Sequence, residues 1–385
     1  MPYAPIIHYI MRLINLCKGY LDNAATSRYK PQCVISAVKK ELKQSSNPGR
    51  GAHKGSIGSA QKIEECRFEV CELTGMPYAV FTKSCTEAIN LAVMGMNLSG
   101  EVITTVFEHN SILRTLKRLE AQGKIDLRII RPSGFAVTAK DIRPYLSAKA
   151  SLLAISEMSN VTGARHEIEE ISAAAKEKGI PVLLDCAQSL GHTEADYKDV
   201  DMIAASGHKG LYGPQGVGFL AFREIKFKPL ICGGTGTDSF NLMQPESYPE
   251  GFESGTQNTP CIAGLCEAIK WTRKNKQKIA QKIKYLSARM VEGLKSLNGV
   301  KLYYENENGV VSFNVRDIPS GEAANILDAE FGIAVRSGLH CAPLAHRFLG
   351  TEKQGAVRAS VGWGNRENDI DLLLEGIEYI LKNPK

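Results

Sequence analysis

The stretch Ser206-Gly207-His208-Lys209-Gly210-Leu211-Tyr212-Gly213-Pro214 places a single lysine in a glycine-rich loop. Apolar, strand-like runs at 201–205 and 217–222 flank the loop, so both of its ends are expected to be anchored in a sheet. A lysine held partly away from water loses some preference for the ammonium form, and its free amine can condense with an aldehyde. The stretch therefore predicts a Schiff base at Lys209, and an exposed lysine on a glycine-rich hairpin is the alternative.

Strand-like and helix-like segments alternate before this loop, which predicts an α/β fold with a mostly parallel sheet flanked by helices. Among the helices, one is expected from about Ser59 to Leu73 and another over 138–146. In an open sheet of this kind, a ligand lies beyond the carboxyl ends of the strands. Polar residues gather at four such ends, and we expect them to form one site: Glu108-His109-Asn110, Ser159-Asn160, Asp185-Cys186-Ala187-Gln188 and Ser206-Gly207-His208-Lys209.

Three of these polar side chains suit an aldehyde cofactor with a pyridine ring, such as pyridoxal phosphate (PLP). Asp185 would keep the ring nitrogen protonated, and Gln188 would reach the ring hydroxyl. His109 would stack on the ring or move a proton. A helix-capping aspartate and a core or capping histidine are the alternatives.

A polar turn, Lys83-Ser84-Cys85-Thr86, joins a strand-like run to a mostly apolar helix. The first turn of a helix offers free backbone N–H groups to a phosphate, so this turn is a candidate phosphate site. A simple helix cap by Ser84 or Thr86 is equally consistent with the sequence.

Two further candidates lie near the C-terminus. In Arg336-Ser337-Gly338-Leu339-His340-Cys341-Ala342-Pro343 a cysteine follows a histidine, and basic neighbours favour the thiolate, so Cys341 is the candidate nucleophile. Arg358 lies on an apolar, strand-like run and needs an anionic partner there. A substrate carboxylate or a structural ion pair would meet that need.

The composition limits the class of protein. The 385 residues carry a mild net charge of +6 and ten cysteines without a C-x-x-C pair, so we expect a reduced, cytoplasmic protein without a metal site. No nucleic-acid motif and no run long enough to span a membrane occurs. We expect a docking segment at 1–19, a large domain at 20–245 and, after a Gly/Pro/Ser-rich stretch, a small α+β domain at 246–385.

From residue 20 onward the chain resembles a known family, the class V aminotransferase-fold enzymes, and within it the group II, SufS-type cysteine desulfurases. The resemblance rests on eight motifs: Tyr-Leu-Asp-Asn-Ala-Ala-Thr at 20–26, Thr-Glu-Ala-Ile-Asn at 86–90, Glu-His at 108–109, Ser-Asn-Val-x-Gly at 159–163, Asp-x-Ala-Gln at 185–188, Ser-Gly-His-Lys at 206–209, Glu-x-Gly-Thr-x-Asn at 253–258 and Arg-x-Gly-x-His-Cys-Ala at 336–342. It implies PLP-dependent transferase fold type I.

The resemblance also implies roles for single residues. Lys209 would carry PLP and Cys341 would take the sulfur of L-cysteine as a persulfide, releasing alanine. The residues implied around the cofactor ring and the substrate are His109, Asp185, Gln188, Asn160, Arg358 and, as the next candidate for the carboxylate, Arg336. Those implied around the phosphate are Cys85, Thr86, Ser206, His208 and, from the second subunit of a homodimer, Thr256.

Three departures from the family pattern place the sequence in a side branch: the extra Gly210, Cys85 where threonine is common, and the continuation Pro343-Leu344-Ala345-His346. A selenocysteine lyase would share every cofactor residue, and an aminotransferase of the same fold would have no use for Cys341. A binding partner in a sulfur-relay assembly is a further alternative, because fold alone does not fix the activity.

Overall fold

The computed structural model describes residues 18–383 except 45, 50 and 238. The predicted docking segment 1–19 therefore lies outside the described residues, apart from its last two. Within the described part of the chain, none of the helices combines the length and the apolar character that a bilayer crossing needs.

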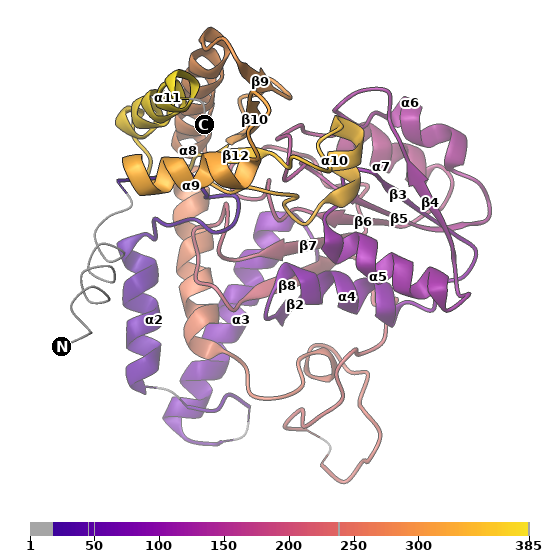
Figure 1. Ribbon diagram of the computed structural model, residues 1–385. Helices are drawn as coiled ribbons and strands as arrows, with labels where there is room; N and C mark the ends of the chain where they lie inside the picture. The colour runs from indigo at the N-terminus through magenta and orange to yellow at the C-terminus, as the bar shows by residue number, and fades with distance from the viewer. Residues whose placement is uncertain (1–17, 45, 50, 238, 384–385) are drawn as a thin grey trace, which may run out of the picture.

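A seven-stranded sheet forms the centre of the molecule (Figure 1). Its order is β2-β8-β7-β6-β5-β3-β4, and neighbouring strands are parallel except that β8 runs antiparallel to both β2 and β7. The strands are β2 (Tyr78–Thr82), β3 (Glu101–Thr105), β4 (Asp126–Ile130), β5 (Ala150–Ser156), β6 (Val182–Asp185), β7 (Met202–Ser206) and β8 (Gly218–Phe222). The prediction of a mostly parallel α/β sheet is confirmed.

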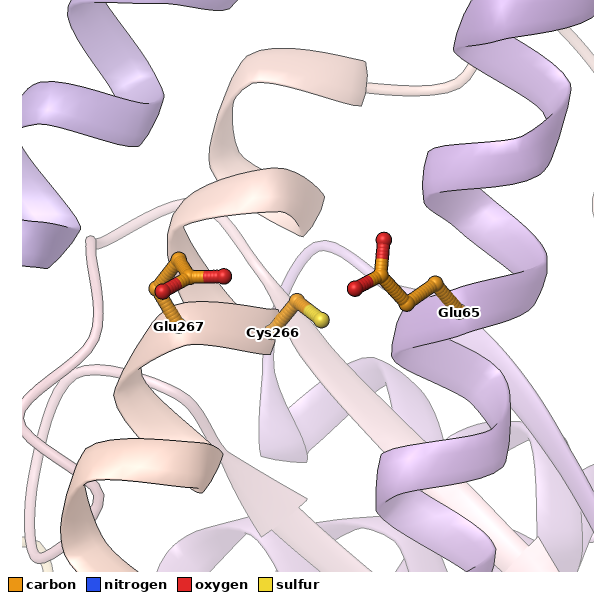
Figure 2. A group of neighbouring side chains, drawn as sticks. All are labelled: Glu65, Cys266 and Glu267. Atoms are coloured by element: carbon orange, nitrogen blue, oxygen red, sulfur yellow. The ribbon is translucent and has the colours of Figure 1, made fainter.

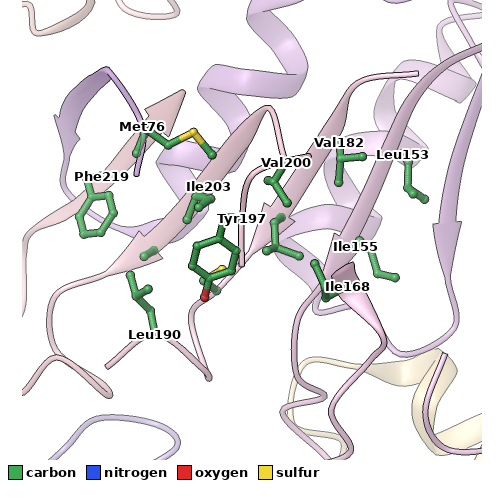
Figure 3. Close-up of a cluster of buried hydrophobic side chains, with 14 of the residues drawn as sticks. Met76, Leu153, Ile155, Ile168, Val182, Leu190, Tyr197, Val200, Ile203 and Phe219 are labelled. Carbon is green, nitrogen blue, oxygen red and sulfur yellow. The ribbon is translucent and has the colours of Figure 1, made fainter. Parts of the chain in front are cut away.

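Helices cover both faces of this sheet because successive strand residues point to opposite sides. On β5, Leu153 and Ile155 lie in one apolar core, and Leu152 and Ala154 lie in the other. Figure 3 shows the first of these cores, with Leu153 and Ile155 among its side chains. The helices that supply it are α3 (Lys54–Thr74), α6 (Ala139–Ile142), α7 (Ile168–Lys176) and the first half of α8 (Thr259–Ser296). Those of the opposite face are α4 (Cys85–Gly95) and α5 (Asn110–Ala121).

Two expected boundaries are corrected. The helix expected over 138–146 ends at Ile142 and continues as a 3-10 turn, Arg143–Tyr145, because Pro144 lacks the N–H that the helix needs. The helix expected from Ser59 begins at Lys54, where the His53 side chain accepts from the backbone N–H of Ser56 and caps the first turn.

The C-terminal part packs around a third apolar core. The second half of α8 supplies Ile279, Ile283, Leu286 and Met290 to it. Its other elements are β9 (Val300–Leu302), β10 (Val310–Val315), α9 (Ser320–Phe331), β11 (Ile333–Ala334), β12 (Val357–Ser360) and α11 (Glu367–Lys382). Helix α10 (Pro343–Leu349) packs instead against the first core, through Ala345, Phe348 and Leu349. Helix α8 thus joins two cores, and α2 (Gln32–Gln44) packs along it. Strand β1 (Gly19–Tyr20) pairs with β11, so the start of the described chain reaches the C-terminal part.

Candidate active site

The carboxyl ends of the central strands open into one pocket with an empty volume of about 530 Å³, within the range of small-molecule sites. The predicted residues that line it are Cys85, Thr86, His109, Asn160, Asp185, Gln188, Ser206, His208 and Lys209. Nine residues expected from five separate segments therefore meet in one place. Ser84 lines the pocket too, and its hydroxyl accepts from the backbone N–H of Glu87 at 3.2 Å, so the alternative prediction of a helix cap at Ser84 is confirmed. No role was predicted from the sequence for the remaining lining residues: Ser111, Ser156, Met158 and Ala187.

Lys209 lies in the loop that joins β7 to β8, and the backbone of that loop is firmly held. Gly207 N–H donates to the carbonyl of Val217 at 3.0 Å, which closes the loop at its base. The carbonyl of His208 accepts from the backbone N–H and the hydroxyl of Ser27, at 2.9 and 3.0 Å, and from Nζ of Lys30 at 3.3 Å. The residue before Lys209 is thus fixed by a segment about 180 positions earlier in the chain.

Burial lowers the pKa of Lys209, while Asp185 and Cys85 act in the opposite direction. The removal from water that the sequence suggested is therefore present. A lowered pKa increases the fraction of free amine, which is the form that attacks an aldehyde. The extra Gly210 packs tightly in the same loop, because a Cβ atom there would come within 2.4 Å of the Leu190 carbonyl oxygen.

Asp185 ends β6 and is buried. Its Oδ1 accepts from the backbone N–H of Ala187 at 2.9 Å and from the thiol of Cys85 at 3.4 Å. Gln188 lines the pocket too, and its Nε2 donates to the carbonyl of Ala24 at 2.9 Å. This contact holds the side-chain amide of Gln188 against the Tyr20–Thr26 segment.

His109 caps α5, and the arrangement fixes its tautomer. Its Nδ1 accepts from the backbone N–H of Ser111 at 3.0 Å, so in the neutral ring the proton is on Nε2. Burial lowers the pKa of His109 to about 4, with Asp185 opposing and nearby cations adding to the shift. The imidazole is therefore neutral at pH 7 and suited to stacking on an aromatic ring.

Glu108, next to His109, is a functional candidate that the sequence reasoning did not assign. It is fully buried, and burial raises its pKa to about 7. Its Oε2 accepts from the N–H and the hydroxyl of Ser156 at 2.8 and 2.6 Å, and its Oε1 accepts from Thr105 at 2.6 Å. Glu108 thereby links the ends of β3 and β5 beside the pocket.

Two buried polar atoms of the pocket lack a protein partner: the hydroxyl of Ser206 and Nδ1 of His208. Buried polar groups are normally hydrogen-bonded, so such atoms indicate a ligand. Ser206 lies close to the N-terminus of α4, because it pairs with Gly218 of β8, where a Cβ atom would come within 2.9 Å of the Cys85 backbone nitrogen. His208 lines the same pocket as Cys85 and Thr86. The N-terminus of a helix favours an anion.

Arg358 lies on β12 with only 1% of its surface exposed. Its Nη2 is 3.0 Å from Oδ1 of Asp22, and its Nη1 donates to the carbonyl of Asn160 at 2.9 Å. Its Nε is buried without a partner. The expected anionic partner is therefore present within the chain as Asp22, which the sequence did not single out, and one donor is still available.

Cys341 is exposed, in the loop between β11 and α10. Its Sγ lies 3.9 Å from Nη2 of Arg336. The pocket holds the loop by its backbone: Asn110 N–H donates to the carbonyl of Cys341 at 2.7 Å, and Nδ2 of Asn160 donates to that of His340 at 2.8 Å. Cys341 thus lies beside the pocket without lining it.

Thr256 is exposed and does not line the pocket of its own chain. It lies before α8, on a long segment that carries three strongly exposed apolar side chains: Phe240, Leu242 and Met243. Thr256, which the resemblance places at the phosphate, therefore lies apart from the nine predicted residues that line the pocket.

A separate cluster, Glu65, Cys266 and Glu267, is the one group of metal-ligand type found among the described residues (Figure 2). Its ligand atoms lie within 4.8 Å of one another on α3 and α8. Lys62 and Lys270 form ion pairs with Glu65, and Lys270 also pairs with Glu267. The two lysines supply the positive charge that balances the carboxylates.

Known proteins resemble this chain over almost its full length, and residues 19–373 match the aminotransferase class-V family. A probable cysteine desulfurase from Pyrococcus abyssi is 35% identical over 389 aligned residues, covering 94% of each protein. The apo structure of a cysteine desulfurase from Thermococcus onnurineus NA1 has a TM-score of 0.86 at 34% identity and covers 94% of both chains. The S-sulfonic acid form of the Escherichia coli cysteine desulfurase CsdA has a TM-score of 0.81 at 27% identity, covering 94% of this chain and 95% of its own. The chain belongs to the aminotransferase class-V family.

Proposed function

We propose that the chain is a PLP-dependent cysteine desulfurase, which converts L-cysteine to L-alanine and takes the sulfur onto an enzyme cysteine. One observation carries the proposal: a lysine whose pKa is lowered by burial shares a pocket with Asp185, and an exposed cysteine lies beside it. The relatives named as cysteine desulfurases cover the same span of the chain and support the same activity.

The residues of the pocket fit PLP. The unpaired Ser206 hydroxyl and His208 Nδ1, with Cys85 and Thr86 at the start of α4, would hold the phosphate. Lys209 would bind the aldehyde carbon, Asp185 would accept a hydrogen bond from the protonated ring nitrogen, and Gln188 and Asn160 would face the ring hydroxyl. When bound, the cofactor supplies an electron sink for bonds at the amino-acid substrate.

The substrate would be held and cleaved by residues of this chain. The free Nε–H of Arg358 would bind the carboxylate, with Arg336 as the next candidate. The thiolate of Cys341 would attack the substrate sulfur, so that an S–S bond forms while the C–S bond breaks and leaves its electron pair on carbon. That carbon then takes a proton, which Lys209 or His109 would supply, and L-alanine leaves.

We further propose a homodimer in which Thr256 completes the phosphate site of the partner subunit. The exposed position of Thr256 and the apolar Phe240 and Leu242 on the same segment support this arrangement, because large exposed apolar side chains mark contact surfaces. A sulfur-acceptor protein would receive the persulfide for iron–sulfur clusters or other sulfur-containing products. The nine described cysteines are all free thiols, which supports a reducing, cytoplasmic location.

The activity is tested by incubating the PLP-loaded protein with L-cysteine and a reductant and measuring sulfide and alanine together. The proposal predicts equal yields of the two products without any keto acid. Alanine formed only when a keto acid is added would indicate an aminotransferase. Turnover of L-selenocysteine but not of L-cysteine would indicate a selenocysteine lyase.

A further inference from the structure

The loop that carries Cys341 has a backbone conformation that its residues do not favour by themselves. His340 has a φ of 49° and Cys341 a φ of 56°, so two successive non-glycine residues lie in the left-handed region. This region is unfavourable for residues with a Cβ atom, and it persists only where surrounding contacts impose it. The contacts that hold this loop therefore decide where Cys341 points.

Behind the loop, three side chains form a continuous hydrogen-bonded line. Nδ1 of His340 is 3.1 Å from Nε2 of His346 on α10, and Nδ1 of His346 is 2.7 Å from Oγ1 of Thr351, just after that helix. At the other end, Nε2 of His340 is 3.5 Å from the carbonyl of Arg336. The line thus connects Arg336, which precedes Cys341, and Thr351, which follows it, to His340, the residue directly before the nucleophile.

The direction of these hydrogen bonds follows from their ends. The Arg336 carbonyl can only accept, so Nε2 of His340 donates and its Nδ1 accepts. Nε2 of His346 must then donate to His340, and Nδ1 of His346 accepts the hydroxyl proton of Thr351. One set of neutral tautomers satisfies the whole line.

The surroundings keep both rings neutral. His340 is 3% and His346 0% exposed, and Thr351 is buried with them. Burial lowers the pKa of His346 to about 4, and burial, with the charges of Arg358 and Arg336 adding to it, lowers the pKa of His340 to about 2. A proton on His340 would make both of its nitrogens donors and reverse the bonds to His346 and Thr351. The line is therefore a fixed support near neutral pH.

We propose that His340, His346 and Thr351 are positioning residues that hold the Cys341 loop in its left-handed conformation, so that the thiol is presented at the pocket. The proposal rests on the proposed role of Cys341 as sulfur acceptor. None of the three side chains touches the substrate in this account, because they lie behind the loop. They act through the backbone of His340, which Asn160 holds from the pocket side at 2.8 Å.

The test uses the PLP-loaded protein with His346→Leu, which removes the line, and His346→Gln, whose amide can again donate toward His340. His346→Leu should bind PLP, respond to L-cysteine with an unchanged KM within about threefold, and lose about 10- to 100-fold in kcat, the range expected when buried partners are left unpaired. His346→Gln should recover most of kcat. In the cofactor-free protein, the peptide covering 337–343 should exchange its amide hydrogens faster in His346→Leu than in the unsubstituted protein.

Two comparisons keep the proposal falsifiable. His166→Leu removes another buried histidine, whose Nδ1 accepts from the backbone N–H of Val137. This variant should be less stable but should not change the amide exchange of residues 337–343. If His346→Leu does not fold, Thr351→Val removes one donor at similar volume and should change kcat in the same direction. Unchanged kcat and unchanged exchange in both loop variants would overturn this inference, whereas a fully active Cys341→Ser would overturn the proposed function itself.

Discussion

The loops of Lys209 and Cys341 are held in different ways. Lys209 lies between two strands of the central sheet, and the backbone beside it is bound by several donors from residues 26–30. Cys341 is the exposed residue of a turn with a left-handed backbone, and side chains from α10 and from the loop after β5 hold this turn in place. One loop is positioned by the strands that flank it, and the other by contacts between distant segments.

The difference matches what each residue would do. A lysine that binds a cofactor gains from burial, because burial lowers its pKa and fixes its direction. A cysteine that passes sulfur to another molecule needs exposure, yet it must also reach the pocket. The flanking strands are sufficient to bury and orient Lys209, whereas an exposed cysteine that reaches the pocket needs a projecting loop that other side chains hold in place.

The largest expected effect is at Lys209. Lys209→Ala should abolish the reducible yellow absorbance of the PLP-loaded protein and lower turnover of L-cysteine by at least about a thousandfold. The reason is that Lys209 is the only lysine among the described residues that line the pocket. Lys274→Ala is the control, because Lys274 is an exposed lysine of α8, and this variant should keep both the absorbance and the turnover. The assignment of Lys209 is wrong if its variant keeps that absorbance.

Arg358 should have the next largest effect. Arg358→Lys keeps the positive charge but loses the Nε–H donor, which should weaken substrate binding by about 2–5 kcal/mol and raise KM. Asp22→Asn, which removes the carboxylate partner and leaves the guanidinium, should change KM much less. A purely structural ion pair predicts the opposite pattern, with both variants less stable and both KM values unchanged in steady-state assays.

A smaller effect is expected at Glu108, and it depends on pH. Burial raises its pKa from 4.5 to about 7 in the folded protein, so between these values the folded state binds more protons than the unfolded state. Stability therefore falls as pH rises through this window, by up to about 3 kcal/mol from this group. In urea unfolding of the cofactor-free protein, Glu108→Gln should lose less stability than the unsubstituted protein between pH 5 and 8.

The exposed Glu224→Gln variant is the control for this experiment. Its pH dependence should follow that of the unsubstituted protein. Parallel curves for Glu108→Gln and the unsubstituted protein would show that Glu108 is not protonated in the folded state at pH 5, against the account of its burial.

Much of the pocket could be predicted because its residues directly follow strands. His109, Asp185 and Lys209 come after apolar runs, and parallel strands bring such positions to one edge of the sheet. The roles proposed for these residues stay predictions. The domain division at 245 also stays a prediction, and α8, which begins after it at Thr259, contributes to two cores. The local pattern was sufficient to find these three residues because a short apolar run identifies a strand, and the polar residues that follow it lie at the end of that strand.

The remaining features depend on contacts that no local pattern contains. Asp22 pairs with Arg358 across 336 positions, and His346 meets His340 only because α10 folds back beside the loop. The left-handed backbone at Cys341 occurs without glycine, so composition gives no sign of it. Pro144 is the exception, because its effect on α6 is local and could have been read from the sequence.

The sulfur-transfer step is tested most directly by Cys341→Ser with labelled L-cysteine. The variant should still bind PLP and still change its absorbance when L-cysteine is added, but it should release almost no alanine and carry no labelled sulfur, because no thiolate accepts the sulfur. Cys232→Ser, which changes another exposed thiol, should behave like the unsubstituted protein. Full alanine release by Cys341→Ser, or a persulfide on a different cysteine, would contradict the account.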